Sequence, residues 1–320
     1  MEICHYAEDL KQQPTWFLLL GLLGLLSLSK STFSLLKWLY VTFLRPPKNL
    51  IKSYGSWALV TGPTDGIGKA FAFQLARKGL HLVLVGRNPD KLATVSDEIK
   101  AEYGKTQINT VVVDLSGDLS EGVRRIREAI EGVDVGVLVN NAGVSNLYGK
   151  YVHEMGEEEV ERMLSVNVKG MTLVTRVVLE GMLRRGRGAI VNVGSGSVFV
   201  TPSSPLFSVY AATKAYIDQF SRSLYVEYKK SGIDVQCQIP LFVATRMYSK
   251  RKLTKRPLFV ASPEAYARAA IRWIGYEPRV CPYLPHFIQW CLVSLVPEFI
   301  VDESRLRFGI RRKYINKDER

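Results

Sequence analysis

Short apolar runs alternate with helical patterns through the middle of the chain, and this alternation constrains the fold more than any other feature. Apolar runs that read as strands occupy residues 56–61, 81–85, 110–114, 135–140, 189–193 and 233–239. Strands that alternate with helices predict an α/β fold, a doubly wound parallel sheet with helices on both faces. Ligands bind such sheets in a crevice at the carboxyl ends of the strands, so the residues after each strand are candidates for a site.

The first strand runs directly into a glycine-rich turn, residues 62–68, that opens a helix. Glycines let the backbone approach a pyrophosphate, whose charge then meets free N–H groups and the positive end of the helix dipole. We therefore predict a dinucleotide site that includes Gly62, Asp65, Gly66, Ile67 and Gly68. The spacing, G-x-x-x-G-x-G, differs from the G-x-G-x-x-G of most dinucleotide folds, so the surrounding pattern has to support the prediction.

The second strand is followed by Arg87 and Lys91. In a mononucleotide-binding unit this position faces the adenosine ribose, where an acidic residue would accept from a free 2′-hydroxyl. Basic residues favour a 2′-phosphate instead, which predicts NADP rather than NAD, the alternative being an ordinary basic surface turn. Asp114 ends the third strand and Asn141 directly follows the fourth, and both complete the predicted cofactor edge.

Tyr210 and Lys214 lie four residues apart in a predicted helix, so their side chains share one face. A lysine ammonium favours the phenolate and lowers the pKa of a nearby tyrosine, which makes the phenol a usable proton donor at neutral pH. Taken alone, the pair also fits an amphipathic lysine lying along a ring on a helix surface.

Together the motifs resemble the short-chain dehydrogenase/reductase family. The matching segments lie between about residues 53 and 275: residues 61–68, 140–143, 167–170, a serine after the fifth strand, and 210–214. The resemblance implies that Tyr210 is the catalytic acid and that Lys214 lowers its pKa and holds the nicotinamide ribose. It also implies that Asn167 assists a proton relay and that Val243 and Thr245 meet the nicotinamide amide.

The resemblance further implies a serine that orients the substrate carbonyl, and two serines compete for that role. The usual family interval of thirteen residues before the tyrosine lands on Ser197, whereas alignment by the fifth strand lands on Ser195. We choose Ser195, because loop length changes more easily than strand register. Two departures stand out: Asp65 replaces a basic residue common in NADP-preferring relatives, and Leu241 replaces a glycine.

Residues 16–28 and 33–44 are apolar, and residues 15–44 read as one helix or a tight hairpin able to hold the chain in a bilayer. Acidic residues before the run disfavour a cleaved signal peptide. Basic residues follow the segment and only Lys11 precedes it, so the rest of the protein is expected to face the cytosol. We divide the chain into an anchor and linker (1–50), an NADP-binding reductase domain (51–275) and a membrane-associated extension (276–320).

Basic and apolar segments alternate from residue 250 to the end of the extension. Basic residues 250–256 predict either a solvated or headgroup-facing loop or a lid that binds coenzyme A phosphates. Residues 285–301 are apolar enough for a second membrane contact, and the basic residues of 305–313 suit an anionic cytosolic surface.

The formal net charge of +13 demands an anionic partner. No nucleic-acid motif appears, so lipid headgroups and phosphorylated small molecules are favoured over nucleic acid. The four cysteines are scattered without ligand spacing, which predicts neither a metal site nor a disulfide framework, and favours a reducing compartment.

The whole layout resembles one branch of the family, the membrane-bound 3-oxoacyl-CoA reductases of very-long-chain fatty acid elongation, most of all the plant form. That resemblance implies NADPH-dependent reduction of a 3-oxoacyl-CoA at the endoplasmic reticulum membrane, on its cytosolic side, with other enzymes of the elongase as partners. A 17β-hydroxysteroid dehydrogenase is the enzymatic alternative. An idle membrane scaffold of the elongase complex is the alternative of another class, which the intact Asn/Ser/Tyr/Lys set disfavours.

Overall fold

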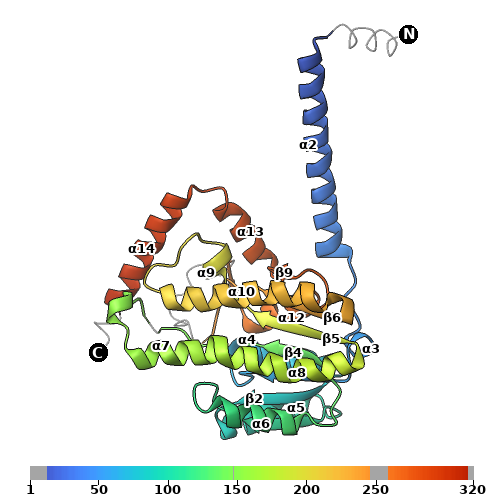
Figure 1. Ribbon diagram of the computed structural model, residues 1–320, viewed down its shortest axis with the longest axis vertical. Helices are drawn as coiled ribbons and strands as arrows, with labels where there is room; N and C mark the ends of the chain where they lie inside the picture. The colour runs from blue at the N-terminus through green and yellow to red at the C-terminus, as the bar shows by residue number, and fades with distance from the viewer. Residues whose placement is uncertain (1–12, 147, 246–258, 316–320) are drawn as a thin grey trace. The chain divides into compact units, whose positions relative to one another are not determined.

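The computed structural model describes residues 13–146, 148–245 and 259–315 (Figure 1). The chain forms two compact units, of which the first ends at Pro46 and the second begins at Pro47.

Over residues 13–46, the described part of the first unit, the chain forms a single apolar helix. Helix α2 (Thr15–Leu39) continues without a break into the π-helical turn η1 (Tyr40–Leu44), and none of their side chains is buried. At 1.5 Å per residue, the 30 residues extend about 45 Å, more than the roughly 30 Å of a bilayer core. The segment is therefore one helix rather than a hairpin, and its length and composition fit a membrane anchor. It ends at Arg45, which is extended because the following proline disfavours helical backbone.

The second unit is built on a seven-stranded parallel sheet of order β3-β2-β1-β4-β5-β6-β9, which confirms the predicted doubly wound α/β fold. The strands are β1 (Trp57–Thr61), β2 (His81–Gly86), β3 (Ile108–Val112), β4 (Val135–Asn140), β5 (Gly188–Val193), β6 (Ile233–Gln238) and β9 (Arg279–Val280). The strand order reverses direction between β1 and β4, which places the expected ligand crevice there. Strand β3 begins and ends two residues earlier than predicted, and β9 was not predicted because two residues carry no pattern.

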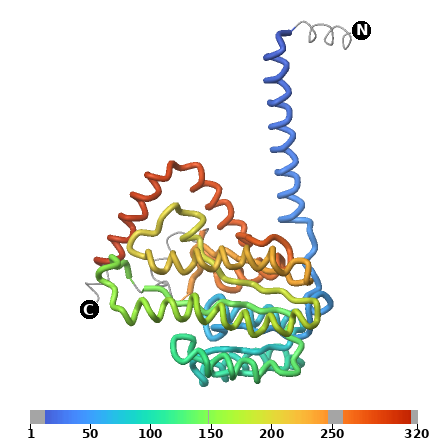
Figure 2. Tube along the Cα trace, in the orientation of Figure 1, coloured from blue at the N-terminus to red at the C-terminus, as the bar shows by residue number. Residues whose placement is uncertain are grey.

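Helices cover both faces of the sheet (Figure 2). One core lies between the sheet and α4 (Gly66–Arg77), α5 (Pro89–Glu102) and α12 (Pro263–Ile271). The other lies against α6 (Leu119–Ala129), α8 (Met171–Arg185) and α10 (Ser208–Tyr228). Ala58 and Val60 of β1 enter the first core and Leu59 the second, so this strand is apolar on both faces.

The remaining short elements connect these layers. They are α3 (Leu50–Ser53), η2 (Val152–Glu154), α7 (Glu157–Leu164), the π-helical turn η3 (Ser165–Gly170), α9 (Gly196–Phe199) and η4 (Lys229–Ser231). Strands β7 (Phe242–Val243) and β8 (Val260–Ala261) pair in a separate two-stranded sheet. The long helix predicted near residues 157–184 is therefore α7 and α8 with a π turn between them.

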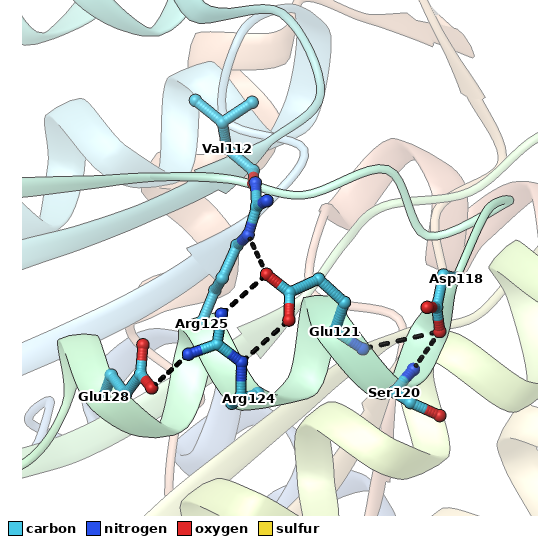
Figure 3. Close-up of polar contacts among 7 residues, drawn as sticks. All are labelled: Val112, Asp118, Ser120, Glu121, Arg124, Arg125 and Glu128. Carbon is cyan, nitrogen blue, oxygen red and sulfur yellow. Dashed lines mark hydrogen bonds and ion pairs between the residues drawn. The ribbon is translucent and has the colours of Figure 1, made fainter.

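Helix α6 is fastened to the end of β3 by a surface network (Figure 3). Asp118 caps the helix by accepting from the N–H groups of Ser120 and Glu121. Glu121 accepts from Arg124 and Arg125, and Arg125 Nη1 also donates to the carbonyl of Val112, 3.3 Å away. Exposed ion pairs add little stability, so the network chiefly fixes where β3 ends and the next loop begins.

Asp234 of β6 gathers three donors near the start of the second unit. It accepts from Tyr54 Oη (2.6 Å), Lys48 Nζ (2.9 Å) and Lys229 Nζ (2.6 Å). Burial alone would raise the pKa of this carboxyl, but the hydrogen bonds from Lys229, Tyr54 and Lys48 outweigh it and hold the pKa below its usual range. Residues 48–54 are thus fixed to the amino end of β6.

Helices α13 (Leu284–Val293) and α14 (Glu298–Ile315) form a bent pair that we call the C-terminal arch (Figure 1). The chain turns by 117° between them. One foot is His286, whose Nδ1 accepts from Leu241 N (3.3 Å) and whose Nε2 lies 3.1 Å from Phe242 O. The other foot is an ion pair between Lys313 and Glu154. Both ends of the arch are held while its apex stands off the domain.

Candidate active site

The glycine turn is held against the end of β4 by contacts that leave no room for a side chain. Gly62 and Gly66 have φ of +65° and +55°, a backbone conformation that favours glycine. A Cβ at Gly68 would lie 2.2 Å from both Gly62 O and Asn141 Nδ2. The Asn141 amide in turn donates to Thr61 O and Gly62 O, both at 3.0 Å. Asn141 therefore acts first as a clamp that joins β4 to the glycine turn.

A cavity of about 590 Å³ runs along this edge of the sheet. It gathers most of the predicted cofactor residues: Gly62, Asp65, Gly66, Ile67, Arg87, Lys91, Asn141, Tyr210, Lys214, Val243 and Thr245. Gly68 and Asp114 do not line it, because Gly68 packs beneath the turn and Asp114 hydrogen-bonds Ser116 instead. The sequence reasoning missed Arg162 of α7, which lines the cavity but stands in no recognisable motif.

The cavity suits a dinucleotide phosphate. The N-terminus of α4 opens at the glycine turn, where helix N–H groups favour an anion. The Asp65 carboxylate accepts from Gly66 N at 2.8 Å and so caps the helix. Arg87 and Lys91 are exposed at the far part of the cavity and supply positive charge. Partial burial raises the pKa of Asp114, but bonds from Ser116 and the charges of Arg87 and Arg162 bring it below its usual value.

Lys214 is buried beside Tyr210, and both side chains lie at the inner end of this cavity. The Lys214 ammonium donates to Val193 O at 2.9 Å and lies 5.8 Å from the centre of the Tyr210 ring. Burial lowers the pKa of Lys214 to about 8, because a charged amine loses hydration there. Helical spacing thus places a cation near the phenol, as the sequence predicted.

Asn167 lies in the π turn η3 and is fully buried. Its amide accepts from Val144 N (2.8 Å) and donates to Val144 O (2.9 Å) and Thr213 Oγ1 (3.0 Å). Thr213 donates to the carbonyl of Tyr210 at 2.7 Å. In these contacts the Asn167 side chain joins the loop after β4 to the helix that carries Tyr210. A π turn often marks a functional position, and this one leaves no mark in the helical pattern of the sequence.

Ser195 and Ser197 are hydrogen-bonded to each other. Ser195 caps the short helix α9, and its Oγ accepts from Ser197 N (3.2 Å) and Ser197 Oγ (2.9 Å). Ser195 lines both this cavity and a second one, whereas Ser197 lines only the second. This arrangement favours Ser195 as the serine nearest the reacting centre, with Ser197 donating to it.

Helix α9 packs on Arg279, which is itself held by an ion pair with Asp218. The Arg279 guanidinium donates from Nε to Asp218 Oδ1 at 2.7 Å and stacks 4.0 Å from the ring centre of Phe199. Asp218 is buried on the same helix as Tyr210. Since a guanidinium stacks well on an aromatic face, this contact fixes the end of α9 relative to α10.

The second cavity, of about 340 Å³, lies between α9, the start of α10 and the C-terminal arch. Ser195, Tyr210 and Leu241 border both cavities. The arch contributes Gln289, Val293, Val296, Ile300, Val301, Ser304, Arg305, Phe308 and Arg312. Four of these residues form a stripe at helical spacing: Ile300, Ser304, Phe308 and Arg312. The basic segment 250–256, predicted as a lid, lies outside the described residues.

Within residues 13–146, 148–245 and 259–315, no group of three or more His, Cys, Asp or Glu side chains could hold a metal ion. The described cysteines, Cys237, Cys281 and Cys291, are free thiols.

Comparison with known proteins gives consistent relatives. Residues 56–256 match the short chain dehydrogenase family. A very-long-chain 3-oxoacyl-CoA reductase-like protein of Arabidopsis thaliana is 47% identical over 308 residues, 96% of this chain and 98% of that protein. The very-long-chain 3-oxoacyl-CoA reductase of Rattus norvegicus is 38% identical, covering 83% of this chain and 84% of that protein. A human protein named inactive hydroxysteroid dehydrogenase-like protein 1 is 39% identical, covering 84% of this chain and 80% of its own length.

Two solved structures share the fold. A 7β-hydroxysteroid dehydrogenase superposes with a TM-score of 0.70 at 26% identity, covering 82% of this chain and 99% of that one. A short-chain dehydrogenase from Sphingobium yanoikuyae in complex with NADPH gives 0.63 at 30% identity, covering 74% and 92%.

The serine pair yields the first prediction. Ser195→Ala should lower kcat/KM about 10²- to 10³-fold, the loss seen when one donor to a reacting oxygen is removed. Ser197→Ala should lower it only slightly, because Ser197 acts through Ser195. Steady-state kinetics on both variants measures the difference. A larger loss for Ser197→Ala would reverse the assignment.

The buried amine yields the second. Lys214 is charged below its folded pKa of about 8 and neutral above it. If the ammonium binds the cofactor ribose, NADPH affinity should fall about tenfold or more as pH rises through that value, since a charged hydrogen bond is worth about 1.5–3 kcal/mol. Equilibrium binding to Tyr210→Phe measures this without the phenol's own titration. A flat affinity across this range would separate Lys214 from cofactor binding.

Proposed function

This chain belongs to the short-chain dehydrogenase family, and from that premise we propose that it reduces very-long-chain 3-oxoacyl-CoA to 3-hydroxyacyl-CoA with NADPH. One observation carries the proposal. Ser195 and Tyr210 border two adjoining cavities, one suited to a dinucleotide and the other lined largely by apolar side chains. A ketone placed between them would meet a hydrogen-bond donor and an acid together.

The residues divide the reaction into positioning and proton transfer. Lys214, Val243 and Thr245 would hold a nicotinamide in the larger cavity, where it would supply the hydride. Tyr210 protonates the oxygen that was the carbonyl, and Ser195 holds that oxygen in place. Lys214 keeps positive charge near the phenol, which favours loss of its proton. Asn167, by fixing the start of α10 to the loop after β4, keeps the acid in register, and its predicted part in a proton relay belongs to the same proposal.

NADP is proposed over NAD because Arg87 and Lys91 follow β2 and line the cofactor cavity, where their positive charge would favour an adenosine 2′-phosphate. The NADPH-bound relative supports the same cofactor class. Asp65 caps α4 by accepting from Gly66 N, so its negative charge is engaged with the backbone.

The acyl-CoA substrate is supported by the relatives named as 3-oxoacyl-CoA reductases and by the apolar second cavity. A steroid ketone is the second candidate, favoured by the likeness to a 7β-hydroxysteroid dehydrogenase. One relative is named inactive, which keeps the idle scaffold as a rival. The complete Asn167, Ser195, Tyr210 and Lys214 set argues for activity, since a scaffold has no need of it.

We place the enzyme in the endoplasmic reticulum membrane with its catalytic domain facing the cytosol. The apolar helix of residues 15–44 and the basic residues that follow it support this orientation. Other enzymes of fatty acid elongation are its expected partners there.

The substrate test uses purified full-length protein with NADPH and either a very-long-chain 3-oxoacyl-CoA or a 17-ketosteroid. Faster turnover of the thioester is expected. Tyr210→Phe should retain NADPH binding while turnover falls about 10²-fold or more, because one positioned acid contributes on that order. No reduction of either substrate by the wild type would favour the scaffold.

Cofactor choice is tested by Arg87→Glu. The substitution replaces attraction for a 2′-phosphate by repulsion, so the ratio of kcat/KM for NADPH to that for NADH should fall about tenfold or more. Lys78→Glu, a charge change at the opposite end of α4, is the matched control and should leave the ratio unchanged. An unaltered ratio in Arg87→Glu would place the preference elsewhere.

A further inference from the structure

The apex of the C-terminal arch exposes a cluster of apolar side chains. Leu295 is 80% exposed, Phe299 73% and Leu292 54%. No charged residue occurs between Leu284 and Pro297. Exposed apolar clusters of this kind mark surfaces that bind another apolar body.

The same two helices line the second cavity from the inside. Val293, Val296 and Ile300 border the cavity, yet Val296 and Ile300 are 40% and 48% exposed. Side chains that line a cavity and keep this much solvent exposure lie near its opening. The cavity therefore runs from Ser195 and Tyr210 toward the apex and opens there.

Among the residues that the structure describes, the contacts that hold the arch lie at its feet and along α14. Besides His286 and the Lys313–Glu154 pair, Ser203 Oγ donates to Asp302, and Gly309 packs closely on Pro205 O and Leu206. These contacts fix both helices near the domain. Glu298 and Asp302 lie on α14 just past the apex, which limits any insertion to a shallow depth.

We propose that the apex of the arch inserts into the surface of a lipid bilayer and that the acyl chain of the substrate passes between the membrane and the active site through the opening there. This rests on the proposed function. The bilayer is the occupant because the chain carries an apolar helix long enough to span one. Arg307 and Arg311 are exposed about two and a half and three and a half turns along α14. Arg307 pairs with Glu303 at 2.6 Å, so the positive charge that complements anionic headgroups comes mainly from Arg311.

Cavity size supports the route. Pockets for drug-sized ligands measure about 300–1,000 Å³, and this one, at about 340 Å³, is at the small end. A very-long-chain acyl thioester is larger than such ligands, so part of it has to lie beyond the cavity. An apolar chain left in water would be costly, whereas a bilayer at the rim would accept it.

The first experiment detects the surface. A photocrosslinking amino acid is substituted for Leu295 in the full chain, reconstituted in vesicles that contain anionic phospholipid. The control places the same amino acid at Val226 of α10, which is 74% exposed but outside the arch. Phospholipid should be captured from position 295 and not from 226. Absence of lipid capture at 295, or equal capture at both, would overturn the bilayer contact.

The second experiment tests the route with the paired substitution Leu295→Gln and Phe299→Gln, and with Val226→Gln as control. Turnover of a long-chain 3-oxoacyl-CoA supplied in vesicles should fall about tenfold or more, since two apolar anchors are lost. Turnover of a short, water-soluble 3-oxoacyl-CoA should stay unchanged, and Val226→Gln should alter neither.

The outcomes separate this proposal from the proposed function. Equal loss for both substrates, or no loss for either, would overturn the route. If the wild type reduces neither thioester, the proposed function and the route fail, while lipid capture at position 295 still decides the membrane contact.

Discussion

The site depends on one contact into which no side chain fits. At Gly68 the backbone of α4 meets the carbonyl of Gly62 and the amide of Asn141 so closely that a single methyl group would collide with both. Because that space is empty, β1, α4 and β4 converge at the point where the strand order reverses. The phosphate-binding turn, the loop after β4 and the helix of Tyr210 are then arranged around a shared edge.

From that edge the two cavities acquire different characters. Backbone N–H groups, Arg87 and Lys91 make one suited to anions. The arch makes the other apolar, with Ser195 and Tyr210 as polar groups near its inner end. Hydrogen bonds hold each candidate residue in place. Asn167 donates to Thr213, which donates to the backbone carbonyl of Tyr210, Ser197 donates to Ser195, and Lys214 donates to Val193 O. Geometry of this kind is what a positioned acid requires.

Most of the sheet and the cofactor edge could be predicted from sequence, because both follow local rules. Apolar runs buried on two faces define parallel strands, and glycines before a helix define the phosphate turn.

The π turn at Asn167 could not be predicted from the sequence, since one extra residue in a helix leaves no periodic trace. The position of the C-terminal arch beside the second cavity could not be predicted for another reason. The apolar run at residues 285–301 has the composition of a membrane contact. Only the tertiary structure shows that Val293 and Ile300 of this run also line the second cavity. Arg162 reaches the cavity from a distant helix and could be found only by tertiary structure.

His286 connects the C-terminal arch to the segment that borders both cavities. Burial lowers its pKa to about 4, so the ring is neutral at ordinary pH and can accept from Leu241 N while donating to Phe242 O. Leu241 borders both cavities, and the ring ties it to the foot of the arch. A ligand in the dinucleotide cavity that shifted residues 240–243 would therefore also shift the foot of the arch, which walls the second cavity. Binding free energies are linked reciprocally, so a cofactor that orders this segment strengthens the hold on substrate by the same factor that substrate strengthens the hold on cofactor. Because this linkage is symmetric, it couples the two cavities through Leu241 whichever ligand binds first.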